Sequence, residues 1–385
     1  MKIAIATGGR FHVLDLAREL HALGHDVTFY SYVPMRRAEK FGLPRRCQRN
    51  LLPYVFPLLA MHGYGPRRMR PVFQRWLVKT LDWLVARRLE PCDVFIGMSG
   101  MFIRACETAR TRYRARVLIE RGSTHIVRQK DILDNLAGGA RVSPFDIRRE
   151  LASYKLADLI IIPSLHVEDS FTQLGFKKEN LFRNRYGVDV EMFSSTPAPS
   201  TTDPTALFVG NWSYQKGCEL WDEVLARLPD LRLIHVGARG DAPMPTTSRF
   251  THVDPVNQWD LRSYYAQAHL CVLASRQEGL SLVLAQALSC GLPLVCSDQT
   301  GGRDLLDLVK DENIVRVFPV DDVDALCRAL RESISYAMTR KGMRAIPKEV
   351  RDQLTWRAYG ERYSRRIEEL MATGSSAPSR DPSEA

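Results

Sequence analysis

The stretch 270–298 constrains the fold more than any other part of the chain. It opens on a short apolar run of strand type (270–274), continues through a polar turn, and then has the residues of a helix at about 281–289. Gly291 fits the position just past that helix, and the apolar run 294–296 follows as a buried strand. This order predicts a βαβ unit whose turn lies at the carboxyl end of a parallel strand, where open α/β sheets bind ligands.

The polar turn of this unit has groups that a phosphate needs. A glycine in the turn lets the backbone approach a ligand closely, and the first amides of the helix have no partner inside it. Such a helix start binds a phosphate or diphosphate. A solvated loop glutamate and a surface amide are the plainer interpretation, and the turn alone favours neither. The candidate binding residues are Glu278, Gly279, Leu280, Ser281, Leu282 and Gln286.

The same stretch resembles the signature of the family 4 retaining glycosyltransferases, also called glycosyltransferase group 1. In that family a glutamate-glycine turn is followed, eight residues after the glutamate, by a second glutamate and then by a Cys-Gly-Leu-Pro ending. Glu278, Gly279 and residues 290–293 match, whereas Gln286 stands in place of the second glutamate. The resemblance implies that residue 286 binds the ribose hydroxyls of a nucleotide. Because an amide lacks the carboxylate charge, we expect weaker binding of a sugar nucleotide.

The amino terminus has a second βαβ start. Residues 2–7 have the pattern of a buried strand, Gly8 and Gly9 form a tight turn, and 12–23 have helical spacing. The Gly-x-Gly-x-x-Gly fingerprint is absent and no acidic residue caps the second strand, which argues against a dinucleotide-dependent oxidoreductase. In the resembled family this glycine loop faces the transferred sugar and the diphosphate. A plain tight turn fits the spacing equally well.

Residues 36–90 carry thirteen Lys or Arg against three acids. The apolar run 51–59 and the aromatic residues Phe73, Trp76 and Trp83 lie among these charges. Cations beside exposed apolar side chains suit the surface of an anionic membrane, at about 1 kcal/mol per cation near the lipid. An apolar core with a solvated arginine face is a second interpretation. Nucleic acid is a third, but no recognition motif supports it.

A polar segment follows the predicted strand 117–120. Its position at the carboxyl end of a strand makes Arg121, Ser123 and His125 candidate site residues. In the resembled family a histidine in such a loop contacts the sugar of the donor, and His125 is the best match. A lone histidine is more often structural, so only its position favours this role.

The second half of the chain opens on a predicted strand, a turn and a helix start that carries Lys216. A lysine at the mouth of a parallel sheet neutralises charge on a departing diphosphate. In the resembled family an arginine after the first glycine shares this task, but Asn211 replaces it here, which removes a bidentate phosphate contact. Arg276 or Arg303 could compensate for the missing cation.

Strands and helices alternate in both halves, which predicts an α/β protein with two doubly wound, Rossmann-like domains facing a cleft. The resemblance identifies this as the GT-B architecture and is most specific at 157–193 and 270–296. The predicted parts are an N-terminal acceptor-side domain (1–193), a Ser/Thr/Pro-rich linker (194–205), a C-terminal nucleotide-sugar-binding domain (206–350), a crossover helix that returns to the N-terminal domain (351–371) and a disordered tail (372–385).

The composition is that of an ordinary globular protein, with 45% hydrophobic and 25% charged residues. Eight scattered cysteines without a Cys-x-x-Cys motif indicate a reducing compartment and no structural zinc. The longest apolar run is shorter than a membrane span, and the first residues lead directly into a strand, so we expect no signal peptide. The predicted location is the cytoplasm, or the inner face of the cytoplasmic membrane as a peripheral protein.

The resemblance implies a retaining glycosyltransferase that moves a hexose from a nucleoside diphosphate sugar to a hydroxyl of an envelope glycan or lipid-linked acceptor, in bacterial lipopolysaccharide or polysaccharide synthesis. We expect neither a metal nor a cofactor. His125 and Glu278 would hold the sugar, while Lys216 and the helix amides stabilise the leaving diphosphate. Two alternatives are a sugar-nucleotide epimerase and a catalytically weak partner subunit or sugar-nucleotide-binding protein. The second of these is supported by Asn211 and Gln286.

Overall fold

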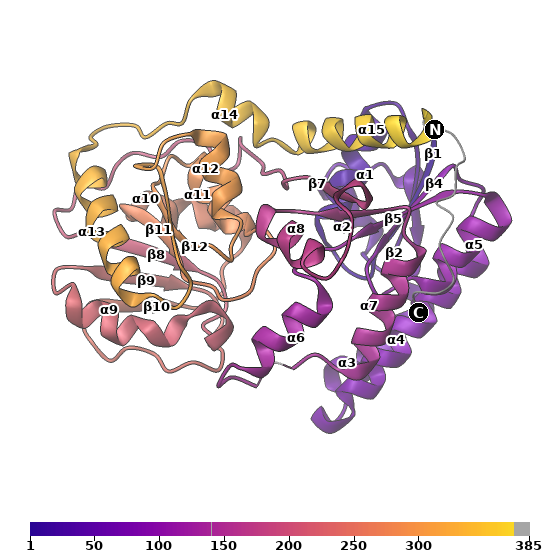
Figure 1. Cartoon of the computed structure of the whole chain (residues 1–385), viewed down its shortest axis with the longest axis horizontal. Coiled ribbons are helices and arrows are strands. Elements are labelled where there is room, and N and C mark those ends of the chain that lie inside the picture. Colours follow the sequence, from indigo (N-terminus) through magenta and orange to yellow (C-terminus); the bar gives the residue numbers. More distant parts are fainter. Residues whose placement is uncertain (140, 373–385) are drawn as a thin grey trace.

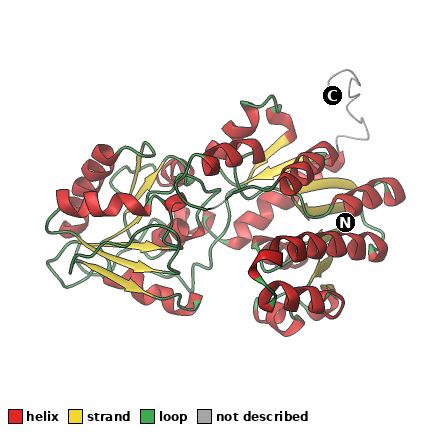
Figure 2. Ribbon diagram, turned by 90° about the horizontal axis from the view of Figure 1, so that it is seen from below, coloured by secondary structure: helices red, strands yellow, loops and turns green. Residues whose placement is uncertain are grey.

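Each half of the chain folds onto its own parallel β-sheet in the computed structural model, which describes residues 1–139 and 141–372 (Figure 1). The strands are short apolar runs buried on both sides, which is what a parallel sheet covered by helices requires. Helices lie on both faces of each sheet (Figure 2). The two doubly wound domains of the GT-B architecture are therefore confirmed.

The N-terminal sheet has seven parallel strands in the order β3-β2-β1-β4-β5-β6-β7. Its strands are β1 (Lys2–Ala6), β2 (Asp26–Ser31), β3 (Gln48–Asn50), β4 (Val94–Met98), β5 (Arg116–Glu120), β6 (Leu159–Ile162) and β7 (Leu181–Arg183). Its helices are α1 (His12–Ala22), α2 (Met35–Lys40), α3 (Leu52–Tyr64), α4 (Arg70–Arg88), α5 (Ile103–Tyr113), α6 (Ile126–Asp134), α7 (Pro144–Leu156) and α8 (Leu165–Thr172).

The C-terminal sheet has six parallel strands in the order β10-β9-β8-β11-β12-β13. Its strands are β8 (Thr205–Val209), β9 (Arg232–Val236), β10 (Phe250–Val253), β11 (Leu270–Leu273), β12 (Leu294–Ser297) and β13 (Val315–Phe318). Its helices are α9 (Trp221–Arg227), α10 (Leu261–Gln267), α11 (Leu282–Ser289), α12 (Gly302–Val309) and α13 (Val323–Thr339), followed by α14 (Lys348–Gln353) and α15 (Trp356–Ala372).

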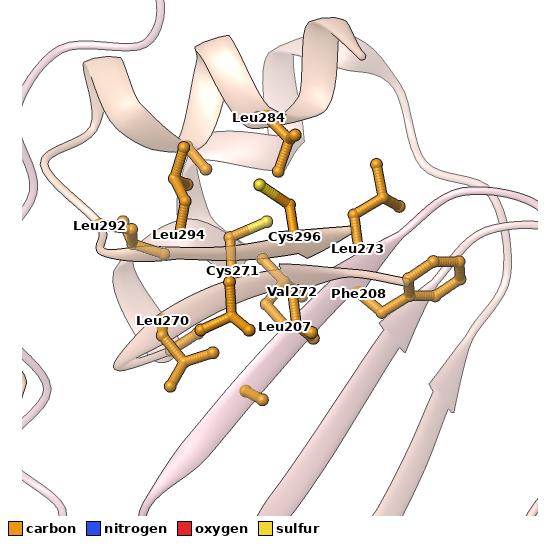
Figure 3. Packing of buried hydrophobic residues seen from close by; sticks show 14 of the residues in the cluster. Leu207, Phe208, Leu270, Cys271, Val272, Leu273, Leu284, Leu292, Leu294 and Cys296 are labelled. Carbon is orange, nitrogen blue, oxygen red and sulfur yellow. The ribbon is translucent and has the colours of Figure 1, made fainter. Parts of the chain in front are cut away.

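The core of the C-terminal domain supports the predicted βαβ unit. Leu284 of α11 packs over the two neighbouring strands β11 and β12, beside Cys271 and Cys296 (Figure 3). All eight cysteines are buried and unpaired, and burial raises the pKa of the Cys296 thiol to about 12. These thiols therefore stay protonated and pack as small apolar side chains.

The last helix, α15, returns to the N-terminal domain, where it runs along the top in Figure 1. Its side chains Tyr359, Tyr363 and Ile367 are buried in the same cluster as residues of α1. The hydroxyl of Ser364 also lies 2.8 Å from Nε2 of His25. The predicted tail begins inside this helix, since residue 372 is its last residue, and residues 373–385 lie outside the described part of the chain.

The basic stretch 36–90 folds mainly into α3 and α4, which pack against each other. One side of α4 is core, with Leu77, Leu81 and Val85 buried, whereas Trp76 and Trp83 of the same helix are exposed. Two of the predicted alternatives therefore each describe part of this stretch. Within residues 1–139 and 141–372, no helix combines the length and the apolar character needed to cross a bilayer.

Candidate functional site

The turn between β11 and α11 carries two backbone amides that the protein itself does not use. Ser281 precedes the first turn of α11 and its side chain caps no amide. In the part of the chain that the structure describes, the N–H groups of Gly279 and Leu280 have no acceptor. The side chain of Leu280 packs into the core cluster of the N-terminal domain, so only its backbone faces a ligand. This turn therefore presents donors for an anion.

Lys216 lies beside this turn on a short 3-10 turn (Tyr214–Lys216). Sequence analysis expected a helix start at this point, but Gly217 adopts a left-handed φ of 67° and the α-helix begins only at Trp221. A Cβ at position 217 would lie 2.4 Å from the carbonyl oxygen of Ala274, so only glycine lets the two segments approach. This close approach brings Lys216 to the carboxyl end of β11.

The ammonium group of Lys216 forms an ion pair with the carboxylate of Glu278. Burial lowers the pKa of Lys216 to about 8. The carboxylate of Glu278 opposes that shift, because it stabilises the charged form of its partner. A cation is thus held next to the free amides of the turn, at the position predicted for a diphosphate.

Gln286 lines a cavity of about 470 Å³ between the two domains. Its Oε1 accepts a hydrogen bond from the hydroxyl of Tyr265 at 3.1 Å, and its side chain is largely buried. Leu282 of the same helix and Arg10 and His12 of the N-terminal domain also line this cavity. The residue predicted to contact a ribose therefore opens onto a space enclosed by both domains.

Gly8 and Gly9 lie just past the end of β1, as predicted. A Cβ at Gly8 would lie 2.7 Å from Cε of Met101, so a side chain there would require Met101 to move. The next residue, Arg10, donates a hydrogen bond across the domains to Oε1 of Gln258 at 3.2 Å. The glycine loop thus faces the C-terminal domain.

Asn211 is exposed, and its amide lies against the loop at Gly240. Of the two cations that could compensate for the missing arginine, Arg276 is paired with Glu219 and Asp321. Arg303 is half exposed, and its nearest carboxylate oxygen, on Asp298, is 3.7 Å away. Arg276 is therefore occupied by structural contacts, while Arg303 has fewer such contacts.

His125 lies in an aromatic cluster of the N-terminal domain. Its ring packs against Tyr154, Phe171 and Phe176, and its Nδ1 accepts the N–H of Val127 at the start of α6. Burial lowers the pKa of His125 to about 4, so the ring is neutral at physiological pH. The described contacts do not bring it to the lysine, glutamate or glutamine of the site. Its role with a sugar stays a prediction.

The neighbours of His125 differ in what they reach. Arg121 is buried and hydrogen-bonded to Glu150, Gln129 and the carbonyl of Thr124, which are all in its own domain. Ser123 accepts a hydrogen bond from the amide of Gln277 in the other domain. Ser123 is therefore the candidate from this segment that meets the glutamate-glycine turn.

Sequence analysis missed two residues that contact this turn from α8. The hydroxyl of Ser164 lies 2.9 Å from the carbonyl oxygen of Gly279, and Nε2 of His166 lies 3.1 Å from that of Glu278. The available signal was their position directly after β6, where polar residues follow a strand of a parallel sheet. Among the residues described, no group of three or more His, Cys, Asp or Glu is placed to hold a metal ion.

Comparison with known proteins identifies the class. The profile of the Glycosyl transferase 4-like domain matches residues 7–187, and that of Glycosyl transferases group 1 matches residues 203–335. The chain belongs to the group 1 (family 4) glycosyltransferases and is an enzyme of that class.

Curated relatives are more distant. The chain is 26% identical over 224 residues to the sulfoquinovosyl transferase SQD2 of Arabidopsis thaliana, a match that covers 53% of this chain and 43% of that protein. A protein of the phosphatidylinositol N-acetylglucosaminyltransferase of the same plant is also 26% identical over 224 residues, covering 53% of this chain and 48% of that protein. The chain thus matches less than half the length of both relatives.

Solved structures share the fold along the whole chain. Sucrose-phosphate synthase from Thermosynechococcus elongatus superimposes with a TM-score of 0.64 at 19% identity, covering 97% of this chain and 100% of that one. Anabaena HepE in complex with UDP-glucose gives a TM-score of 0.63 at 14% identity, with the same coverage. The lipopolysaccharide outer core galactosyltransferase WaaB gives 0.60 at 13% identity, covering 96% and 100%.

Proposed function

We propose that this glycosyltransferase moves a hexose from a nucleoside diphosphate sugar to an acceptor hydroxyl with retention of configuration. The observation that carries the proposal is the turn at Glu278 and Gly279, where two unpaired amides adjoin the buried cation of Lys216. An amide pair and a cation at one point are what a diphosphate leaving group needs. Anabaena HepE, with the same fold, has been solved in complex with UDP and with UDP-glucose.

In the proposed reaction, the bond between the anomeric carbon and the diphosphate oxygen breaks while the acceptor oxygen bonds to the same face of the sugar. The acceptor's proton passes to an oxygen of the departing phosphate. Lys216 and the turn amides stabilise the charge that develops on the diphosphate. Glu278 is engaged with Lys216, so we assign it to sugar binding and to holding that cation, and we leave the nucleophile's task to the acceptor itself.

We propose that no metal ion is required, because the cation and the amides supply the charge that a metal would otherwise supply. The donor is a substrate and no cofactor takes part. Turnover that persists unchanged in EDTA supports this proposal. Turnover that is lost in EDTA and restored by Mg²⁺ or Mn²⁺ contradicts it.

We propose that the acceptor is an envelope glycan or a lipid-linked glycan at the inner face of a membrane. The surface of α3 and α4 exposes Tyr64 (95%), Phe56 (62%) and Trp76 (50%) among basic residues. Exposed aromatic rings beside cations suit the headgroup region of an anionic bilayer. One relative is named as part of a phosphatidylinositol N-acetylglucosaminyltransferase, and one structural neighbour as a lipopolysaccharide galactosyltransferase.

Thermal-shift binding against UDP-, GDP-, ADP-, CMP- and dTDP-linked sugars tests the donor. A ligand stabilises the folded state by about 2.7 kcal/mol at a hundredfold excess over its dissociation constant. A hit with one base supports the proposal and identifies the nucleotide. No stabilisation by any of them contradicts it and favours the alternative of a partner subunit that does not bind sugar nucleotides.

Flotation with anionic vesicles at low salt tests the membrane surface. The double variant Arg67→Glu, Arg68→Glu changes the charge beside α4, and we expect it to lose vesicle binding. The variant Lys177→Glu, Lys178→Glu changes the net charge equally at exposed positions on another part of the N-terminal domain and serves as the control. Equal loss in both variants would mean that net charge alone attracts the protein. No binding by the wild type contradicts the proposal.

A further inference from the structure

The turn at Glu278 and Gly279 is oriented by residues of the opposite domain. Ser164 and His166, at the start of α8, contact its two successive carbonyl oxygens. Ser164 is fully buried and His166 is partly buried, so both contacts are sheltered from water. The two domains are thus joined at the backbone of the turn whose amides we assign to the diphosphate.

The geometry of the peptide bond links these carbonyls to the free amides. In a trans peptide the C=O and the following N–H point in opposite directions within one plane. None of the peptide bonds in the described residues is cis. A hydrogen bond from His166 to the carbonyl of Glu278 therefore fixes the direction of the Gly279 amide, and one from Ser164 to the carbonyl of Gly279 fixes that of Leu280. Both amides point away from α8.

The protonation of these groups suits the task. A carbonyl oxygen only accepts, so Nε2 of His166 must carry a proton to donate to Glu278. Burial lowers the pKa of His166 to about 4, so the ring is neutral and Nδ1 is an acceptor. Nδ1 lies 3.1 Å from the hydroxyl of Ser164. Because that hydroxyl has one proton, it serves either the ring or the carbonyl of Gly279 at any instant, and the contact of His166 is the more permanent of the two.

Further contacts hold the same approach. The N–H of Leu165 donates to Asp304 of the C-terminal domain at 2.9 Å. A Cβ at Gly279 would lie 1.9 Å from the carbonyl oxygen of Gly122, so the turn meets this domain only as glycine. These contacts form only when the domains are closed on each other.

We propose that Ser164 and His166 are positioning residues, which aim the amides of Gly279 and Leu280 at the diphosphate of the donor and do so only in the closed arrangement of the domains. This inference rests on the proposed function. It makes the diphosphate site a product of both domains, although every group that touches the phosphate belongs to the C-terminal one. Closure of the cleft and completion of the site are then a single event.

The test compares a nucleoside diphosphate with the monophosphate of the same base. The probe is the diphosphate that binds wild-type protein most tightly among UDP, GDP, ADP, CDP and dTDP, and affinities are measured by titration calorimetry. His166→Leu keeps the bulk of the side chain and removes the donor. His166→Gln places an amide N–H near the position of Nε2 and serves as the matched rescue. Ser164→Ala, a smaller change, tests the second carbonyl should His166→Leu fail to fold.

We expect His166→Leu to bind the diphosphate about 10- to 100-fold more weakly, the range found when groups that orient metal ligands are removed. Affinity for the monophosphate should stay at the wild-type value, and His166→Gln should restore diphosphate binding. Equal weakening for both nucleotides, or an unchanged diphosphate affinity in His166→Leu and Ser164→Ala, would overturn the inference. If wild-type protein binds none of the five diphosphates, the proposed function itself fails.

Discussion

The replacement Glu278→Gln tests how the site keeps a buried lysine charged. Burial lowers the pKa of Lys216 from 10.5 to about 8, and the carboxylate of Glu278 against its ammonium group works in the other direction. Glutamine has nearly the same size but no charge. In the variant, the pKa of Lys216 should therefore fall to about 8, whereas in the wild type it stays higher.

The size of the effect follows from the titration of one group. With a pKa of about 8, an amine is about nine-tenths protonated at pH 7 and about one-tenth protonated at pH 9. Because the cation is the form that binds diphosphate, the affinity of Glu278→Gln should fall about tenfold between these two pH values. The wild-type affinity should change little over the same interval.

The sign of the accompanying stability change is also defined. In Glu278→Gln the folded chain releases the proton of Lys216 at a lower pH than the unfolded chain. The free energy of unfolding should therefore rise as the pH increases from about 8 toward the unperturbed value of 10.5. Urea unfolding at several pH values measures this rise.

Titration calorimetry with the nucleoside diphosphate at pH 7, 8 and 9 measures the affinities. Adding Lys216→Arg to the variant supplies the control, because a guanidinium group stays charged throughout this range and should remove the pH dependence. Parallel affinity profiles for the wild type and Glu278→Gln would refute the reasoning, since the carboxylate would then have no influence on the charge of Lys216.

Three further outcomes are expected. Lys216→Ala should lower kcat about 100- to 1000-fold with an unchanged circular dichroism spectrum, because a group that stabilises the leaving diphosphate is lost; unchanged turnover would contradict that role. Gln286→Glu should tighten donor binding about tenfold, since hydrogen bonds from ribose hydroxyls to a carboxylate are roughly twice as strong as those to an amide, and weaker binding in calorimetry would argue against ribose contact. Leu284→Ala should cost about 2–5 kcal/mol of unfolding free energy in urea, because this side chain is fully buried under the α11 helix, and a smaller loss would indicate collapse of the cavity.

The sequence was most informative where local pattern and burial agree. The apolar runs at 270–274 and 294–296 became β11 and β12, and the helix expected at 281–289 became α11 with Ser281 just before it. Buried parallel strands must be apolar on both faces, so their sequences are recognisable without knowledge of their partners. The order of such elements was enough to predict two domains and the turn between β11 and α11.

Prediction was weaker where one residue's backbone or one helix's environment decides the outcome. Lys216 was expected at a helix start, but the left-handed conformation of Gly217 ends a 3-10 turn there. The apolar residues of α4 divide into a buried set and an exposed set, as Leu81 and Trp76 illustrate. Their spacing along the helix is compatible with either environment, because only the neighbouring elements determine which side of α4 is covered.

The sequence by itself determined the alternation of strands and helices, the family, and the glutamate, glycine and lysine that converge on one turn, because these depend on local pattern and on residues at fixed spacing. Only the tertiary structure decided which groups meet across the cleft. Ser164 and His166 are more than a hundred residues away in sequence from the carbonyls they contact. Such contacts depend on how two independently folded domains approach each other, and that approach is set by surface complementarity, which no local pattern in the chain encodes.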